Sequence, residues 1–356
     1  MEHRKAINAS LADWIKRKVE TEYPQDIGLV CVYGSWLNGT MNARSDVDCY
    51  FVPETERSLE FAQTFLLEGV GYDIFPMTWQ RLEDIAGLHS PMQPLLGDIR
   101  ILYGTEAAMA RLEKLRETMW ADLADTAYRQ RIARERCELA ANSLAEVAEV
   151  TENARLWETA GFVIAVLADA VAVSRGEYFH FGVKRQFEDL VEGFPGWVAD
   201  GYRAVVEADS GAHAVAAAHS FLEAVCAAVG AQCAASPEAA GIKPVSGPVD
   251  VGILADIYQE ICSTFGKIYV SSQAGNAPLA FRSAASLQGE LREMRAFGCP
   301  EMYLLEDYHF TRLEDLAKTT ARVEEKLVSF IRENGGTIRA YDSFAAFEED
   351  HPVIGK

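Results

Sequence analysis

The sequence predicts an α+β protein, in which a small mixed β-sheet is followed by an all-α domain and a helical C-terminal extension. Short β-branched runs punctuated by glycine and proline fill the first hundred residues, and apolar residues recur at helical spacing from about residue 106 onward. The 356-residue chain is also too long for one ordinary core. We therefore expect three regions, at 1–105, 106–235 and 249–356.

The N-terminal region alternates strands with helices. Ile7, Leu11, Trp14 and Val19 recur at helical spacing, which predicts a first helix that ends at Pro24. Thr78 is a good N-cap for a short helix that follows it. Apolar runs predict strands over 27–34, 47–52, 70–79 and 99–104, and residues 57–68 have a helical pattern.

The remainder reads as helical. Thr311 and Glu314 form the pattern of a capping box, which predicts a last long helix from Thr311 to the glycines at 335–336. Prolines and small residues over 233–250 are typical of a linker. The other predicted helices cover 107–120, 128–150, 154–174, 183–192, 197–208 and 212–230.

Charge and composition narrow the function. The net charge of −20 disfavours a nucleic-acid partner, which normally meets a basic face, and suits a cationic small substrate. Seven cysteines without a C-x-x-C pair are expected to be mostly free thiols in a reducing compartment. We expect no signal peptide and no membrane-spanning stretch, and so a cytoplasmic protein without a membrane partner.

Two carboxylates interrupt a predicted strand. Asp46 and Asp48 stand at i and i+2, so their side chains point to the same face and repel each other unless a cation lies between them. Asp73 interrupts the next strand in the same way. Oxygen ligands suit magnesium, and three carboxylates can hold two ions roughly 3.5–4 Å apart, as in phosphoryl transfer. The sequence therefore predicts a Mg²⁺ site at these three aspartates.

Residues upstream of the aspartates suit a phosphate. Gly34 lets the backbone approach an anion closely, and Ser35 offers a hydroxyl and an N–H at a helix start. Arg44 and Ser45 add donors just before the carboxylates. We expect these four residues to contact the triphosphate of a nucleotide.

The pattern Gly34-Ser35, Asp46-Val47-Asp48 and Asp73 resembles the signature of the DNA-polymerase-β-like nucleotidyltransferase superfamily. The order of sheet and helices over about residues 1–230 is also similar to the aminoglycoside adenylyltransferases of the streptomycin/spectinomycin type. In those enzymes a helix–turn–helix stretch supplies a lysine to the nucleotide phosphates. Lys184, within "GEYFHFGVKRQ", matches that position.

The resemblance implies transfer of AMP from ATP, with Mg²⁺, to a hydroxyl of a small acceptor such as an aminoglycoside, with release of pyrophosphate and a role in antibiotic resistance. A carboxylate would act as general base, and Glu135, Glu138 and Glu158 are candidates, of which Glu138 is our choice. Alternative functions are a protein adenylyltransferase, a toxin–antitoxin component, or a nucleotide-binding module without turnover. The last hundred residues would cover the substrate cleft or form a homodimer contact.

Overall fold

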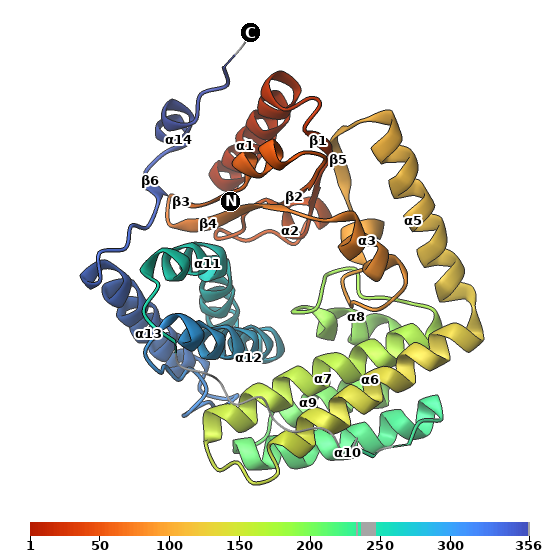
Figure 1. The fold of residues 1–356 in the computed structure, drawn as a ribbon. Coiled ribbons are helices and arrows are strands. Elements are labelled where there is room, and N and C mark those ends of the chain that lie inside the picture. The colour runs from red at the N-terminus through yellow and green to blue at the C-terminus, as the bar shows by residue number, and fades with distance from the viewer. Residues whose placement is uncertain (233, 236–246, 355–356) are drawn as a thin grey trace. The chain divides into compact units, whose positions relative to one another are not determined.

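The computed structural model describes residues 1–232, 234–235 and 247–354, and the chain divides into two compact units (Figure 1). The first unit combines Met1–Asp122, Ala255–Gly266 and Thr337–Lys356, and the second combines Leu123–Leu254 and Lys267–Gly336. This division differs from the three consecutive regions expected from the sequence. Two segments of the predicted C-terminal region pack with the N-terminal sheet instead, for reasons given below.

The first unit is built on a mixed six-stranded sheet in the order β5-β1-β2-β4-β3-β6. Strands β2 and β4 run parallel, as do β3 and β6, and the other neighbours are antiparallel. The sheet with its helices confirms the predicted α+β class. The strands are Ile27–Tyr33 (β1), Asp48–Pro53 (β2), Gln63–Leu67 (β3), Val70–Pro76 (β4), Arg100–Gly104 (β5) and Ala340–Tyr341 (β6).

One face of this sheet is a hydrophobic core. Alternate residues of the strands, such as Val30, Phe51 and Ile74, are fully or almost fully buried there. Helix α1 (Glu2–Glu22) places Trp14 and Val19 against them, which confirms the predicted first helix. Because strand side chains alternate between faces, this core leaves the intervening residues to point to the opposite face. The other helical segments of the first unit's N-terminal part are α2 (Ser35–Asn38), η1 (Glu56–Phe61), α3 (Trp79–Ala86), α4 (Pro94–Gly97) and α5 (Glu106–Ala124).

The predicted helix over 57–68 is wrong in its second half. A 3₁₀ helix, η1, covers Glu56–Phe61, and the residues that follow form strand β3. Glu68 and Gly69 both adopt positive φ, at 50° and 71°, which makes the tight turn of a β3–β4 hairpin. The alternation of buried Phe65 and Leu67 was a strand signal that the helical pattern obscured.

The C-terminal segment completes this sheet and core. Strand β6 pairs with β3, and helix α14 (Phe344–Asp350) follows it. Phe347 on α14 is fully buried, with ring centroids 4.9 Å from Trp14 and 4.5 Å from Phe65. Residues 337–354 therefore belong to the first unit through both backbone pairing and aromatic packing.

The middle of helix α11 (Val251–Gln273) covers the other face of the sheet. A Cβ built on Gly71 of β4 would lie 2.4 Å from the carbonyl oxygen of Gln259, so the absence of a side chain there lets the helix approach. Gln259 is fully buried, and its Oε1 accepts a 2.6 Å hydrogen bond from the Arg339 backbone N–H. The helix is thus held between β4 and the segment that leads into β6.

The second unit is a helical bundle. Helix α7 packs against α6, α9, α10 and α12, and is buried along most of its length. The bundle confirms the predicted helices of residues 128–230. Its helices are α6 (Thr126–Glu146), α7 (Asn153–Arg175), α8 (Gln186–Gly193), α9 (Gly196–Val206), α10 (Gly211–Val229), α12 (Ala277–Glu293), η2 (Met294–Phe297) and α13 (Leu313–Glu333).

Two helices of the bundle meet the length and composition of a membrane span, contrary to the expectation that no stretch would. They are α7, with a mean hydropathy of 1.8 over its most apolar window, and α10, with 1.4. The α7 window is 89% buried within the protein, as in the core helix of a bundle, and the α10 window is 39% buried. The sequence-based expectation was wrong because the long apolar core of α7 is interrupted only by Asp169, which Arg136 pairs at 2.9 Å.

The observed helix caps and cysteine states agree only in part with the predictions from the sequence. Thr78 caps α3 as predicted, by accepting a 3.2 Å hydrogen bond from the Arg81 N–H. The capping box at Thr311 is wrong: α13 begins at Leu313, and the Thr311 hydroxyl lies 2.9 Å from Nδ1 of His309. Cysteines 31, 49, 137, 262 and 299 are free and buried, whereas Cys226 is disulfide-bonded. Cys233 and most of the predicted linker over 233–250 lie outside the described residues.

Phe347→Ala should destabilise the first unit by about 3–5 kcal/mol, because it opens a cavity between two fully buried aromatic rings. Chemical denaturation followed by Trp fluorescence measures the loss. Phe344→Ala on the same helix is the matched control, since Phe344 only packs against the edge of the cluster. Equal midpoints for the two variants would contradict the role assigned to α14.

Candidate functional site

A row of polar side chains crosses four neighbouring strands on the face of the sheet opposite the α1 core. Tyr33 on β1 pairs with Asp48 on β2, and Thr64 on β3 pairs with Asp73 on β4. Since β2 and β4 are parallel and in register, Asp48 and Asp73 are neighbours on adjacent strands about 4.8 Å apart. The structure thus places two of the predicted carboxylates side by side.

The environment of Asp73 is negatively charged. Burial raises the pKa of this carboxyl most, the nearby charges of Glu260 and Asp48 act in the same direction, and together they bring it to about 7. The Thr64 hydroxyl, whose Oγ1 lies 3.2 Å from Oδ1 of Asp73, acts in the opposite direction by stabilising the carboxylate. Like charges gathered in a partly buried place favour a bound cation.

The third predicted carboxylate belongs to the same cluster. Burial raises the pKa of the Tyr33 phenol well above its usual value, and the charges of Asp48, Asp46 and Asp73 add to this, in that order. Asp46, Asp48 and Asp73 thus lie within electrostatic range of one hydroxyl, and a metal site formed by all three stays a prediction.

Gly34 is required by the position of Asp48. Its φ is +78°, a conformation that favours glycine, and a Cβ on it would lie only 1.9 Å from Oδ2 of Asp48. The close approach seen here is thus to a carboxylate. Ser35 is the first residue of the short helix α2. The contact of Gly34 and Ser35 with a phosphate stays a prediction.

A buried hydrogen-bond network fixes the backbone of Asp46. The Asn8 side chain on α1 donates to the carbonyl oxygens of Ser45 and Asp46, at 3.2 and 3.0 Å. Asn8 accepts a 2.6 Å bond from the Tyr72 hydroxyl, to which Arg4 donates at 3.2 Å. Asn8 is fully buried, so its amide is held in one orientation. Sequence reasoning missed this network because its hydrogen bonds join residues 37 to 68 positions apart in the chain, which show no motif.

The loop before Asp46 is ordered by its own side chains. The Ser45 hydroxyl accepts a 2.9 Å bond from the Asn42 N–H, and the Asn42 side chain accepts a 2.7 Å bond from the Arg44 N–H. The exposed Arg44 side chain runs beside α11, 3.4 Å from where a Cβ of Gly266 would be. Ser45 is buried and orders the loop, and contact of either residue with a triphosphate stays a prediction.

Glu260 is a fourth carboxylate at this site that the sequence analysis missed. It lies on α11 and directly follows Gln259, whose carbonyl oxygen packs on Gly71. Gly71 is two residues from Asp73 along β4. The charge of Glu260 raises the pKa of Asp73. The only signal in the sequence is the polar Gln259-Glu260 pair within a mostly apolar stretch of the helix. Nothing in that pair indicates which strand the helix covers.

Two other predicted site residues lie in the second unit. Glu138 is exposed on α6. Lys184 precedes α8, which begins at Gln186, so it is not in the first turn of a helix as the predicted 183–192 boundaries implied. Glu158, an alternative general base, is instead held by two arginines, as described below. The roles of Glu138 and Lys184 in catalysis and phosphate binding stay predictions.

Among the residues that the structure describes, no group of three or more His, Cys, Asp or Glu side chains already has the spacing of a metal cage. Asp48 and Asp73 nevertheless supply paired oxygen donors in a negatively charged place. Magnesium is commonly held by one or two carboxylates together with substrate phosphates and water. The donor set thus fits Mg²⁺ that arrives with a phosphate ligand better than Mg²⁺ bound by protein alone.

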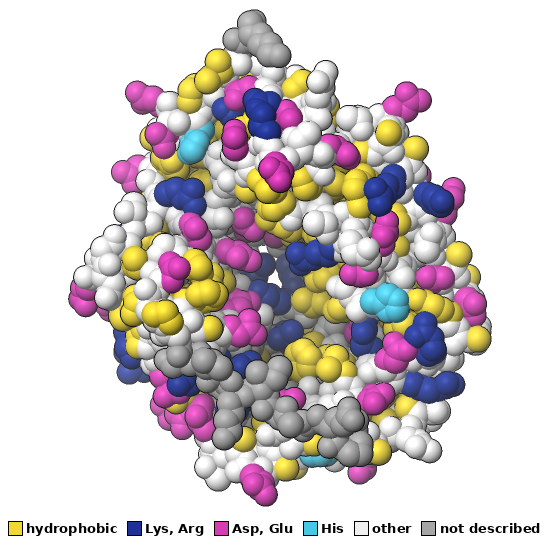
Figure 2. Space-filling view, viewed as in Figure 1, with side chains coloured by type: hydrophobic (Ala, Val, Ile, Leu, Met, Phe, Trp, Pro, Cys, Tyr) yellow, Lys and Arg dark blue, Asp and Glu magenta, His cyan; other side chains and the backbone are white. Residues whose placement is uncertain are grey.

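The surface charge is mixed. On the face shown in Figure 2, acidic and basic side chains are interspersed, and no extended basic area of the kind that binds nucleic acid is visible.

Asp73→Asn should stabilise the metal-free protein, and more so at pH 8 than at pH 5. The folded pKa of about 7 exceeds the ordinary value of 3.8, so the stability lost through Asp73 grows as the pH rises from about 4 to 7 and is constant above that. The shift corresponds to at most about 4 kcal/mol. Thermal unfolding in EDTA at both pH values measures the gain. A variant equally stable as the parent at pH 8 would show that the charges are already compensated.

Comparisons with known proteins yield little for this chain. No protein-family model and no curated protein matches it. One solved structure to which it is similar is that of a nucleotidyltransferase-like protein from Exiguobacterium sibiricum 255-15, with a TM-score of 0.33 and 12% sequence identity over 63% of this chain and 74% of the other. A likeness of this degree assigns neither an activity nor a substrate.

Proposed function

We propose that the chain is a magnesium-dependent nucleotidyltransferase that moves AMP from ATP onto a hydroxyl of a small acceptor and releases pyrophosphate. The observation that carries the proposal is the placement of Asp48 and Asp73 on neighbouring parallel strands, with Asp46 within electrostatic range of the same Tyr33 hydroxyl. Convergent carboxylates on adjacent strands serve to bind divalent cations in phosphoryl transfer.

In this proposal Asp46, Asp48 and Asp73 hold Mg²⁺ together with the triphosphate. The ions would stabilise negative charge on the transferred phosphoryl group and on the departing pyrophosphate. The network from Arg4 through Tyr72 and Asn8 keeps the Asp46 backbone in place, which limits the reorganisation needed on binding. Arg44 would neutralise phosphate charge, and contact of Lys184 with the phosphates stays a prediction.

Glu260 is suited to accept the proton of the acceptor. The acceptor oxygen would attack the α-phosphorus while the α–β phosphoanhydride bond breaks, and its proton would pass to the Glu260 carboxylate. Glu260 lies in the same unit as the aspartates and within electrostatic range of Asp73. We therefore prefer it as general base to Glu138, which lies in the second unit.

The acceptor in this proposal is a cationic small molecule, such as an aminoglycoside, and the enzyme would act in the cytoplasm in antibiotic resistance. Four carboxylates in one unit and a chain charge of −20 favour a cationic partner over an anionic one. A protein acceptor is the main alternative, and labelled ATP in cell lysate distinguishes the two by whether label appears on a small molecule or a protein band. ATP binding without turnover on any acceptor would favour a nucleotide-binding module.

Asp48→Asn should abolish pyrophosphate release from ATP and Mg²⁺ in a screen of amino-sugar and other hydroxyl acceptors, with a loss of about 10³-fold or more, because it removes one charge from the cation site. Asp13→Asn is the matched control: it makes the same change in an exposed i,i+4 ion pair with Arg17 on α1. Full activity in D48N would rule out the site, provided that D13N is also active.

Glu260→Gln should lower kcat by about 10²-fold with little change in the KM for ATP, and should remove the acidic limb of the kcat–pH profile, because the amide cannot accept a proton. Steady-state kinetics across pH 5–9 tests this. An E260Q enzyme with raised KM for ATP and an unchanged pH profile would instead identify Glu260 as a ligand of the Mg²⁺–nucleotide complex.

A further inference from the structure

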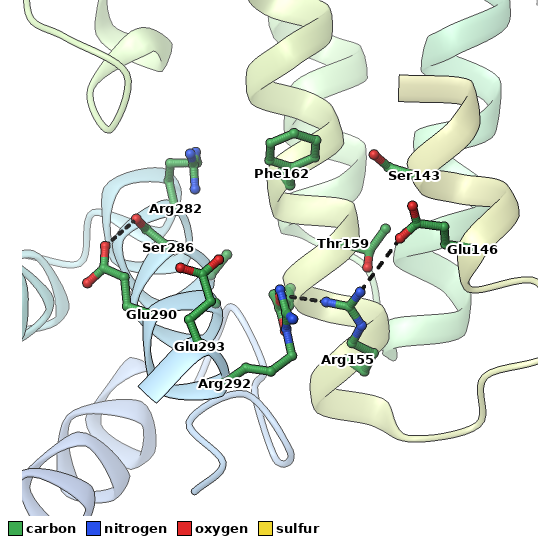
Figure 3. Close-up of a pocket in the computed structure, with 13 residues that line it drawn as sticks. Ser143, Glu146, Arg155, Thr159, Phe162, Arg282, Ser286, Glu290, Arg292 and Glu293 are labelled. Carbon is green, nitrogen blue, oxygen red and sulfur yellow. Dashed lines mark hydrogen bonds and ion pairs between the residues drawn. The ribbon is translucent and has the colours of Figure 1, made fainter. Parts of the chain in front are cut away.

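A cavity of about 330 Å³ lies within the second unit, between helices α6, α7 and α12 (Figure 3). It shares no residue with the carboxylate site of the first unit. Charged, hydroxyl and aromatic side chains line it together, which is unusual for a packing defect, since genuinely empty cavities are apolar.

The walls of the cavity are formed by close helix packing. Gly161 on α7 lies against Ala285 on α12, and a Cβ on that glycine would come within 2.4 Å of the Ala285 Cβ. Trp157 packs edge-on against Phe281 of the same two helices, with centroids 5.4 Å apart. Both helices are therefore fixed, and the cavity is preformed and does not depend on loop positions.

One wall carries charges that neutralise one another. The Glu158 carboxylate on α7 accepts hydrogen bonds from Arg155 at 2.6 Å and from Arg292 at 3.0 Å. Arg155 also lies 4.0 Å from the carboxylate of Glu146 on α6. These residues tie the three helices together, and Glu158, one of the general-base candidates from the sequence, is engaged here in ion pairs with two arginines.

Arg282 differs from these residues: the charge of Glu290 acts on its guanidinium at a distance, but no hydrogen bond or ion pair in the described chain holds it. Its side chain is only 8% exposed, and within the described part of the chain it makes no hydrogen bond or ion pair, while its Nε is buried without a partner. Burial lowers the pKa of the guanidinium, although an arginine remains charged. A buried charge without a partner is costly, and a guanidinium in a polar cavity matches a carboxylate or another planar anion.

Carboxylates stand further along the same helix. Glu290 follows Arg282 by two turns, about 12 Å along the axis, and its Oε2 is buried without a partner while Oε1 accepts from the Ser286 hydroxyl at 3.2 Å. Glu293 is exposed beside it (Figure 3). Across the cavity, Phe162 on α7 presents an aromatic ring that is 41% exposed.

We propose that this cavity binds a small zwitterion. Its anionic group pairs with Arg282, its protonated amine lies between Glu290 and Glu293, and its carbon skeleton packs on Phe162. A simple anion fits less well, because Glu290 and Glu293 repel it, and a simple cation leaves Arg282 unpaired. This site goes beyond nucleotidyl transfer and does not rest on it, since it lies wholly within the second unit.

The test is isothermal titration calorimetry of the full chain, without nucleotide, against 6-aminohexanoate, L-lysine and L-phenylalanine, with hexanoate and hexylamine as single-charge analogues. At least one zwitterion should bind at least tenfold more tightly than either analogue. No binding by any of the three zwitterions, or equal binding of hexanoate or hexylamine, overturns the proposal.

Single-residue variants then test whether the zwitterion binds at Arg282 and Glu290. Arg282→Met and Glu290→Gln should each weaken the bound zwitterion tenfold or more, whereas the matched surface changes Arg322→Met and Glu325→Gln on α13 should not. The melting temperature of R282M should equal or exceed that of the parent, because the change removes an unpaired buried charge. Unchanged affinity in R282M or in E290Q overturns the proposal, and E290Q decides alone should R282M fail to fold.

Discussion

The first unit is organised around electrostatic repulsion between two carboxylates on neighbouring strands. Asp48 begins β2 and Asp73 lies within β4, each one residue before the first parallel pair of the two strands, and this register leaves no freedom to separate them. Gly34 has no side chain because the Asp48 carboxylate occupies that space, and the Thr64 hydroxyl offsets part of the charge of Asp73. A fold that served stability alone would place apolar residues here, so the arrangement carries an electrostatic cost, which the proposed cation binding would offset.

Some residues of the site could be predicted from the sequence, and others follow only from tertiary packing. The D-x-D spacing and the isolated Asp73 could be recognised because carboxylates stand out beside apolar runs. Both strands form, but β2 begins at Asp48, so Asp46 lies before the strand and not on it as predicted. The sequence did not predict that Glu260 belongs to the site, since its place beside Asp73 follows from the packing of Gly71 against α11. The hairpin after Phe61 was misjudged because local helical spacing competed with the long-range pairing of β3, which decided the outcome.

Two buried charged side chains of the second unit differ in their pairing. Glu158 is neutralised by arginines of two helices, so its charge contributes to cohesion of the bundle. Arg282 lies on the same helix as one of those arginines and is more deeply buried, yet among the described residues it makes no ion pair, and the charge of Glu290 acts on it only at a distance. The two arginines of α12 thus differ in how their charges are paired.

Strand β6 and helix α14 have a consequence for biosynthesis. The ribosome releases the N-terminal sheet long before it makes Phe347, the side chain that fills the space between Trp14 and Phe65. During translation the sheet must therefore persist with an open edge at β3 and an incompletely filled interior while some 270 further residues emerge. The N-terminal sheet is completed only by β6 and α14, which are synthesised much later. We therefore expect its folding to depend on chaperones and to be sensitive to stalled synthesis.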